Sequence, residues 1–264
     1  MPYPLLNILT ALPAFALVLF RVSGMVATSP VFASAAIPVR VRAAFALVLS
    51  TMVFPIVFKA SPENAPLALT LAGAVNEFMI GAAIGMTLSL LMLSAEVAGT
   101  LIAQQAGLSL SEVINPLQQT EASVIGQVYA AVFTLLFLSA GGHREAVAAL
   151  LDTYKAVPVL KYEAGEPILL LLVETTLSAF VIGVRVAAPV VIALFLTEAA
   201  LGVVSRTVPQ LNVLSVGFTV RAFVGLGVAA LTLYASQPVV LRGIWDGLDA
   251  IRATFGLEEL TRGA

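Results

Sequence analysis

The sequence predicts an all-α, polytopic membrane protein, and two observations support that prediction. Of its 264 residues, 60% are hydrophobic and 11% are charged, whereas soluble domains carry roughly 25% charged residues. The apolar residues also gather in long runs, and a run of about 20 apolar residues is what a helix needs to cross a bilayer. We therefore expect about six hydrophobic helical segments, several of them kinked.

The predicted segments follow one another along the chain, at about residues 5–28, 43–58, 67–95, 122–140, 168–203 and 212–236. The first lacks a basic leader and contains Arg21, so we expect it to stay as an anchor rather than to be cleaved. The fifth is too long for one simple span and contains Pro189, which removes a backbone donor. We expect a bent helix or two helices there.

The third segment carries Glu77, Gly81 and Gly85 at four-residue spacing, which places them on one helix face. A Gly-xxx-Gly pattern lets another backbone approach closely inside a membrane. We therefore predict that this face packs tightly against neighbouring helices or subunits.

The sixth segment repeats this arrangement with Gly217, Arg221 and Gly225. Because Arg221 shares its face with small residues, we predict that it points toward protein rather than lipid. The polar turn before this segment carries three further candidates for subunit packing, Arg206, Pro209 and Gln210.

Six charged residues lie within or at the edge of apolar runs: Arg21, Glu77, Glu174, Arg185, Glu198 and Arg221. A charge at a helix centre costs at least about 2.5–3.5 kcal/mol on insertion scales. Such residues usually face a bundle interior, pair with one another or line a polar path. The sequence therefore predicts that many helix faces meet protein instead of lipid.

The stretch 96–120 is rich in amides, hydroxyls and small residues, although it lies between two apolar runs. Irregular backbone at membrane depth persists only where it is buried in protein or lines a wet cavity. We interpret the stretch as the lining of a path, and an ordinary solvent loop is the alternative. The candidate residues are Gln104, Gln105, Gly107, Leu108, Ser109, Leu110, Val113, Asn115 and Pro116.

Residues 241–264 form a predicted C-terminal tail with apolar residues at helical spacing. These residues are Ile244, Leu248, Ile251 and Phe255, and Trp245 and three arginines accompany them. The pattern indicates an amphipathic helix, whose apolar face would lie on a membrane interface or on a partner protein.

The composition also excludes several functions. The net charge of −2 provides no basic surface for nucleic acid. The absence of cysteine excludes disulfides, thiolate metal sites and cysteine nucleophiles, and nothing near the single histidine, His143, completes a metal site. The sequence contains no metalloprotease, phosphate-loop or nucleophile-elbow motif. We therefore expect no cofactor, no metal and no enzyme activity.

Four segments that occur in order, 21–47, 77–116, 135–158 and 201–221, together resemble the FliR family of flagellar and type III secretion export-gate proteins. The resemblance implies a non-enzymatic subunit of a helical hetero-oligomer in the bacterial inner membrane, within the flagellar basal body. Its implied partners are FliP-like and FliQ-like subunits, an FlhB-like subunit and unfolded protein substrates.

The resemblance also implies a division of the chain. Residues 1–165 would be a FliP-like part, 166–240 a FliQ-like helical hairpin and 241–264 the amphipathic tail. The stretch 96–120 would hold the channel's plug, in which Leu108, Leu110 and Val113 block ion leakage while Gly107 permits movement. Leucine and valine stand here where family members carry phenylalanines.

The same residues are compatible with two alternatives. The first stays within the resemblance and is a subunit of an injectisome rather than of a flagellum. The second is a secondary transporter with its own substrate site, since broken helices and midplane charges occur in that class as well.

Overall fold

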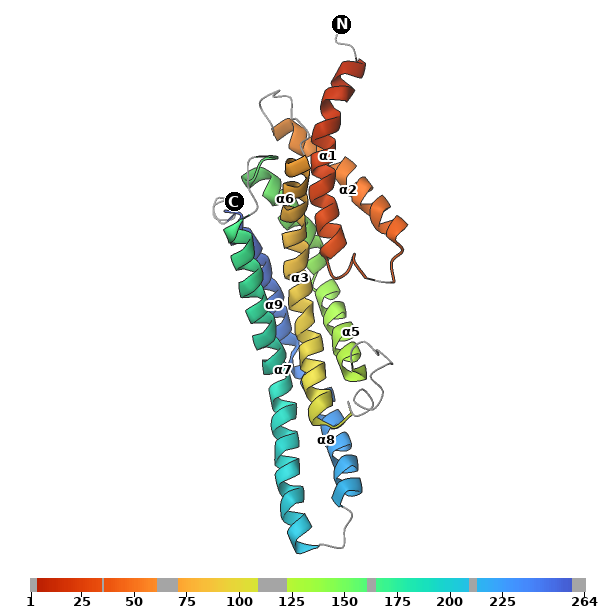
Figure 1. Cartoon of the computed structure of the whole chain (residues 1–264), viewed down its shortest axis with the longest axis vertical. Helices are drawn as coiled ribbons and strands as arrows, with labels where there is room; N and C mark the ends of the chain where they lie inside the picture. Colours follow the sequence, from red (N-terminus) through yellow and green to blue (C-terminus); the bar gives the residue numbers. More distant parts are fainter. Residues whose placement is uncertain are drawn as a thin grey trace. The chain divides into compact units, whose positions relative to one another are not determined.

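The computed structural model describes residues 4–34, 36–60, 71–108, 123–160, 165–208 and 213–257, and these ranges contain helices but no strand. The all-α prediction is therefore confirmed. Figure 1 shows the helices, which are α1 (Pro4–Thr28), α2 (Val39–Ala60), α3 (Leu71–Gln105), α5 (Val124–Ser139), α6 (Gly142–Ala156), α7 (Glu166–Thr207), α8 (Val213–Ala235) and α9 (Gln237–Thr254).

Each of the six predicted segments corresponds to one helix. Four helices contain stretches long and apolar enough to cross a membrane: Val39–Val57, Leu71–Gln105, Glu166–Thr207 and Val216–Ala235. Helices α5 and α6 meet that criterion together, as a pair bent by 62° at a short break. The apolar part of α1 found by the same criterion, Leu12–Thr28, is shorter. The chain is a multi-pass membrane protein.

Two helices differ from the sequence expectation. Helix α7 is one helix that continues through Pro189, so the two-helix alternative does not occur. Proline removes only one helical hydrogen bond, and Val186 and Val190 on either side of it are buried in packing. Helix α3 continues through residues 96–105, which we expected to be irregular. Its buried residues Ile102 and Ala103 continue the apolar face into this polar stretch.

The described chain divides into two units that interleave along the sequence. Unit 1 comprises Met1–Leu91, Gly141–Thr176 and Ile244–Ala264, and unit 2 comprises Met92–Ala140 and Leu177–Gly243. These units do not test the predicted division at residues 165 and 240, which is based on likeness to FliP-like and FliQ-like subunits. That division stays a prediction.

In unit 1, α1, α3, α6 and α9 contribute most of the buried apolar residues. Leu17, Val22, Ile80, Ile84 and Leu150 are among them. The apolar face of α9 is buried in the same core through Ile244, Leu248 and Ile251. This face therefore packs inside the chain. The sequence analysis had expected it to lie on a membrane interface or on a partner protein.

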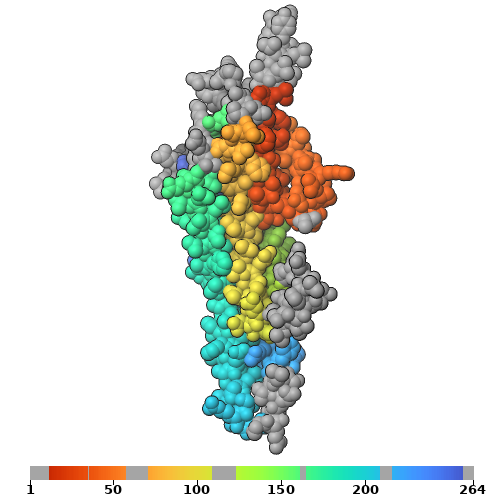
Figure 2. Space-filling model, in the orientation of Figure 1, coloured from red at the N-terminus to blue at the C-terminus, as the bar shows by residue number. Residues whose placement is uncertain are grey.

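Helix α2 is the least buried of the four helices that contain a candidate membrane span. Figure 2 shows it in orange at the surface, and its exposed side chains include Val41, Val48, Met52 and Ile56. It packs against α1, where the rings of Phe15 and Phe54 meet edge to face with centroids 5.6 Å apart. The remaining apolar surface of α2 is available to lipid or to another protein.

In unit 2, the second part of α3 packs against α5 and α7 at glycines. A Cβ atom on Gly99 would collide with the backbone of Gly126, and one on Gly183 would collide with Ser94 and Val97. Tyr129 of α5 joins α8, since its hydroxyl donates to the Ala229 carbonyl at 3.0 Å and lies 2.9 Å from Thr232 Oγ1. The contacts at Gly99 and Gly183 need residues without a side chain at the helix crossings.

Candidate functional site

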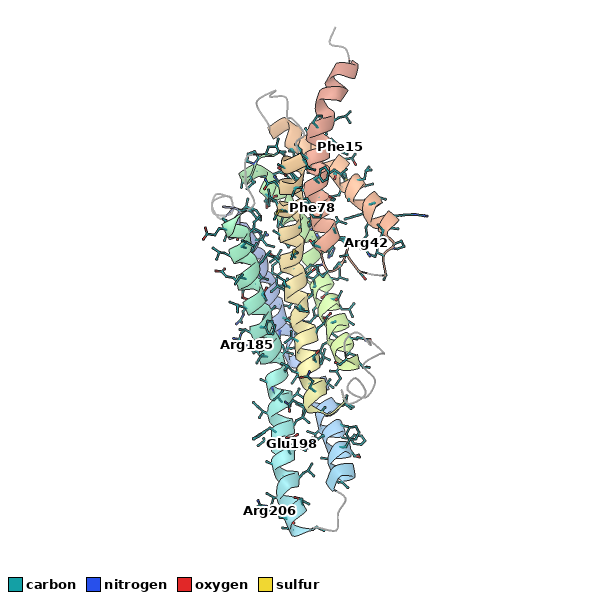
Figure 3. The ribbon with its side chains drawn as sticks, in the orientation of Figure 1. Phe15, Arg42, Phe78, Arg185, Glu198 and Arg206 are labelled. Carbon is teal, nitrogen blue, oxygen red and sulfur yellow. The ribbon has the colours of Figure 1, made fainter. Side chains whose placement is uncertain are left out.

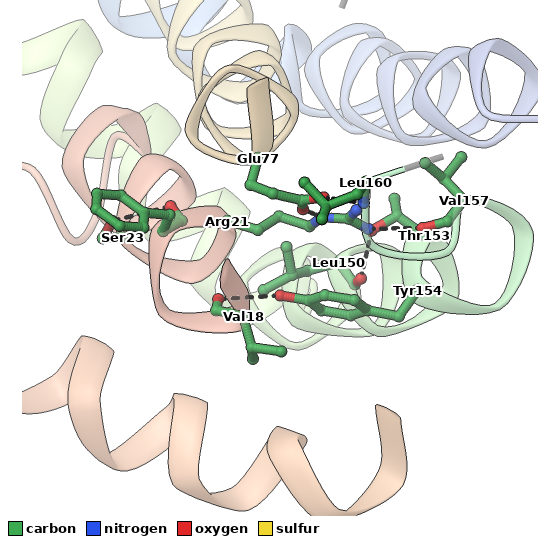
Figure 4. Close-up of polar contacts among 10 residues, drawn as sticks. Val18, Arg21, Ser23, Glu77, Leu150, Thr153, Tyr154, Val157 and Leu160 are labelled. Carbon is green, nitrogen blue, oxygen red and sulfur yellow. Dashed lines mark hydrogen bonds and ion pairs between the residues drawn. The ribbon is translucent and has the colours of Figure 1, made fainter. Parts of the chain in front are cut away.

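Arg21 of α1 and Glu77 of α3 form a buried ion pair in unit 1 (Figure 4). Arg21 Nε lies 2.6 Å from Glu77 Oε2, and neither residue is exposed. Removing one partner of a buried pair leaves the other charge unpaired and typically costs about 3–5 kcal/mol. Arg21 and Glu77 can therefore lie within apolar runs because each neutralises the charge of the other.

The guanidinium of Arg21 also binds α6. Its Nη1 donates to Thr153 Oγ1 at 3.3 Å and to the Val157 carbonyl at 3.1 Å. Its Cζ lies 4.3 Å from the centroid of the Tyr154 ring, a cation–π distance. The Tyr154 hydroxyl in turn donates to the Val18 carbonyl at 3.1 Å. One arginine thus joins three helices of unit 1.

Glu77 uses its second oxygen on the connection that follows α6. The Leu160 N–H donates to Glu77 Oε1 at 2.9 Å. Leu160 has a φ of +66°, in a region that is costly for a residue with a branched side chain. Both carboxylate oxygens are therefore engaged in holding structure, and this cluster pairs no nucleophile with a base.

Gly81 and Gly85 bring α3 close to the backbone of α1. A Cβ atom on Gly81 would collide with the Arg21 carbonyl, and one on Gly85 would collide with Thr28. The Thr28 hydroxyl lies 3.0 Å from the Ala82 carbonyl of α3 and can donate to it. The tight neighbour that the glycine spacing predicted is therefore a helix of the same chain. A role of Glu77, Gly81 and Gly85 between subunits stays a prediction.

The end of α3 lies in unit 2 and leads into the predicted plug. The N–H of Leu108 donates to the Ala103 carbonyl at 3.0 Å, and that of Gly107 to the Gln104 carbonyl at 3.1 Å. This is the Schellman arrangement that ends a helix, and Gly107 supplies the left-handed residue it requires, with a φ of +74°. Gln104 and Gln105 are exposed.

Several predicted site residues lie outside the described ranges. From the plug these are Ser109, Leu110, Val113, Asn115 and Pro116. From the turn before α8 they are Pro209 and Gln210, whereas Arg206 lies at the exposed end of α7 (Figure 3).

Glu198 of α7 and Arg221 of α8 form a second ion pair, in unit 2. Arg221 Nη1 lies 3.1 Å from Glu198 Oε1, and each side chain is more than one third exposed. On the face of Arg221, Gly225 lies against Ala106 and Leu194, and Gly217 lies near Leu201. Arg221 thus contacts protein within its own chain, and the predicted packing of Gly217 and Arg221 against another subunit stays a prediction.

The two remaining charges of the predicted set, Glu174 and Arg185, are both exposed. Neither forms an ion pair with any residue that the structure describes. Pairing was one of the three environments expected for such charges, and these two form no ion pair within the described part of the chain.

Some polar contacts of these clusters could not be predicted from the sequence. The hydroxyl of Tyr129, the hydroxyl of Thr153 and the Tyr154 ring all complete polar clusters. In the sequence, the two tyrosines look like ordinary packing residues of their helices. Only the charged residues within apolar runs indicated that buried polar partners were needed.

The helices and these ion pairs define a class: a polytopic, all-α membrane protein whose charges within apolar helices are partly paired internally and partly left at the surface. The family model of bacterial export proteins, family 1, matches residues 12–246. The chain therefore belongs to that family, the FliR family, and the resemblance seen in the sequence is confirmed.

Individual relatives agree with this assignment. Flagellar biosynthetic protein FliR of Caulobacter vibrioides is 30% identical over 222 residues, which cover 83% of this chain and 87% of that protein. The protein of the same name from Bacillus subtilis is 29% identical over 246 residues, covering 91% and 93%. That of Escherichia coli is 29% identical over 225 residues, covering 83% and 84%.

Proposed function

We propose that this chain is a core, non-enzymatic subunit of the flagellar protein export gate in the bacterial inner membrane. With FliP-like and FliQ-like subunits, and next to an FlhB-like subunit, it forms the channel through which unfolded flagellar substrates leave the cytoplasm. The observation that carries the proposal is the likeness to flagellar biosynthetic proteins over more than 80% of both chains. That shared name favours the flagellum over an injectisome.

The length of α7 supports an assembly with other proteins. Its 42 residues extend about 63 Å at 1.5 Å per residue, which is twice the roughly 30 Å of the hydrocarbon core. Large apolar side chains are exposed along it, from Leu169 to Val203. Because a bilayer covers only part of such a helix in one crossing, the rest of this apolar surface requires protein neighbours.

The end of α3 supports the proposed plug. The chain leaves α3 at the Gly107 turn, directly after the exposed amides of Gln104 and Gln105. Residues 109–116 then form the plug in this proposal, with Leu110 and Val113 excluding water from the closed channel. An entering substrate displaces them.

Secretion by a deletion strain tests the channel function. Removing the gene is expected to abolish secretion of flagellar substrates into the medium, and the wild-type gene restores it. Normal secretion without the gene would refute the proposal.

Cysteine labelling tests the plug. The chain has no cysteine, so Leu110→Cys provides a single reactive thiol. Labelling is expected to increase when a stalled substrate occupies the gate, with Lys155→Cys at an exposed position as the control for general reactivity. Equal labelling of Leu110→Cys in closed and occupied gates would refute the plug.

A further inference from the structure

The part of α7 in unit 2 has one buried side and one exposed side. Its buried side includes Ala179, Gly183, Val186, Ala187, Val190 and Leu194. Gly183 lies against Ser94 and Val97 of α3, which identifies this side as the inner one. Helical spacing of 100° per residue puts Val181, Arg185 and Ile192 opposite to it. We call the exposed residues Leu177, Phe180, Val181, Val184, Arg185 and Ile192 the outer face of α7.

The outer face combines apolar side chains with one cation. Leu177, Phe180, Val181 and Val184 are each more than half exposed. Phe180, Val181, Val184 and Arg185 line a shallow surface hollow. Arg185 lies on α7 in Figure 3, between the two ends of a helix that has the length and composition of a membrane span.

Arg185 differs from the other arginines found in apolar runs. Arg21 pairs with Glu77 and Arg221 with Glu198, but no described residue forms an ion pair with Arg185. The backbone at this position also lacks its helical donor, because residue 189, four positions later, is proline and has no N–H. Arg185 thus combines a guanidinium without an ion pair among the described residues and a carbonyl whose usual i+4 donor is absent.

We infer that the outer face of α7 docks a helix of a partner subunit and that a carboxylate of that helix binds Arg185. The inference rests on the proposed function, and it adds the surface and the chemistry of the contact. Lipid tails offer no acceptor to a guanidinium. A carboxylate matches the guanidinium with two parallel hydrogen bonds. A central arginine surrounded by apolar residues is the arrangement of a protein interface core.

Cross-linking in intact membranes tests which neighbour covers this face. Val184→Cys is modified with a photoreactive maleimide, irradiated, and the products are identified by mass spectrometry. We expect adducts to a FliP-like or FliQ-like subunit. Ala187→Cys is the matched control three residues away, since Ala187 is buried and is expected to remain unmodified.

Charge reversal tests the role of Arg185. We expect Arg185→Glu to reduce the amount of partner subunit that co-purifies by about tenfold or more, as loss of a buried interfacial charge pair does. Arg185→Lys is expected to retain most of the binding. Arg144→Glu is the control, since Arg144 is also exposed and without an ion pair among the described residues, at the start of α6. Reversing the partner's carboxylate is expected to restore binding to Arg185→Glu.

The outcomes separate this inference from the proposed function. If the wild-type chain retains both subunits but position 184 cross-links only to lipid, the docking surface is wrong and the export-gate proposal stands. If position 184 reaches a subunit but Arg185→Glu binds as well as wild type, the carboxylate contact is wrong. If the wild-type chain retains neither subunit, the export-gate proposal fails and this inference fails with it.

Discussion

Arg21 and Glu77 are 56 residues apart in the sequence, and their side chains meet at 2.6 Å in the core of unit 1. The same two side chains reach Thr153, Val157 and Leu160. The pair therefore connects α1, α3 and the end of α6. Arg21 and Glu77 are fully buried, so buried charge in this unit lies where these three elements meet.

Neutralising one member of this pair is expected to destabilise the chain strongly. Glu77→Gln leaves the Arg21 charge buried and unpaired, at a cost of about 3–5 kcal/mol. The double variant Arg21→Met/Glu77→Leu removes both charges and is expected to recover most of that loss. Thermal unfolding of the detergent-solubilised protein measures both effects. A double variant that is as unstable as Glu77→Gln would show that the pair does not act as a unit.

The close crossing of α1 and α3 is expected to exclude even one methyl group. Gly81→Ala places a Cβ atom on the Arg21 carbonyl, so the helices must separate, at a cost of about 1–3 kcal/mol as for other overpacked sites. Gly227→Ala is the matched control, because Gly227 is also helical and has nothing within 4 Å of the new Cβ atom. Steady-state levels in membranes compare the two. Equal levels would contradict the crossing geometry.

The turn at the end of α3 is expected to tolerate asparagine but not valine. Gly107 has a φ of +74°, and the left-handed region costs a residue with a side chain roughly 1–2 kcal/mol, with asparagine favoured over β-branched residues. Secretion is therefore expected to remain near wild type in Gly107→Asn and to fall in Gly107→Val. Secretion assays at matched protein levels check this order, and the reverse order would contradict the assigned turn.

The surface ion pair in unit 2 is expected to matter less than the buried one. Glu198 and Arg221 are each more than one third exposed, and exposed pairs contribute about 0–1 kcal/mol. Arg221→Glu places two carboxylates together and is expected to lower membrane levels modestly. The swap Glu198→Arg/Arg221→Glu is expected to restore them. A swap that behaves like the single variant would assign Arg221 to a contact other than Glu198.

The sequence predicted most of the helices and several properties of the charged residues, because both depend on local composition. Long apolar runs specify helices in a membrane, and glycine spacing specified which face of α3 packs closely. The identity of each charge's partner could not be predicted. It depends on the order and rotation of helices that are distant in sequence, as for Arg21 and Glu77.

Two further differences have tertiary causes. Polar composition suggested that α3 ends near residue 95, but buried Ile102 and Ala103 extend its packing to Gln105. The amphipathic pattern of α9 indicated a face in need of a neighbour, and Ile244, Leu248 and Ile251 find that neighbour inside the chain. The helix face of α9 was thus predicted from its sequence pattern, whereas the prediction of irregular backbone at residues 96–105 was wrong.

Native mass spectrometry of the complex solubilised from its own membranes tests the central claim most directly. The account predicts that this chain is released together with FliP-like and FliQ-like subunits, and that the isolated chain is rare or unstable. A stable, fully detergent-covered monomer as the main species would contradict it.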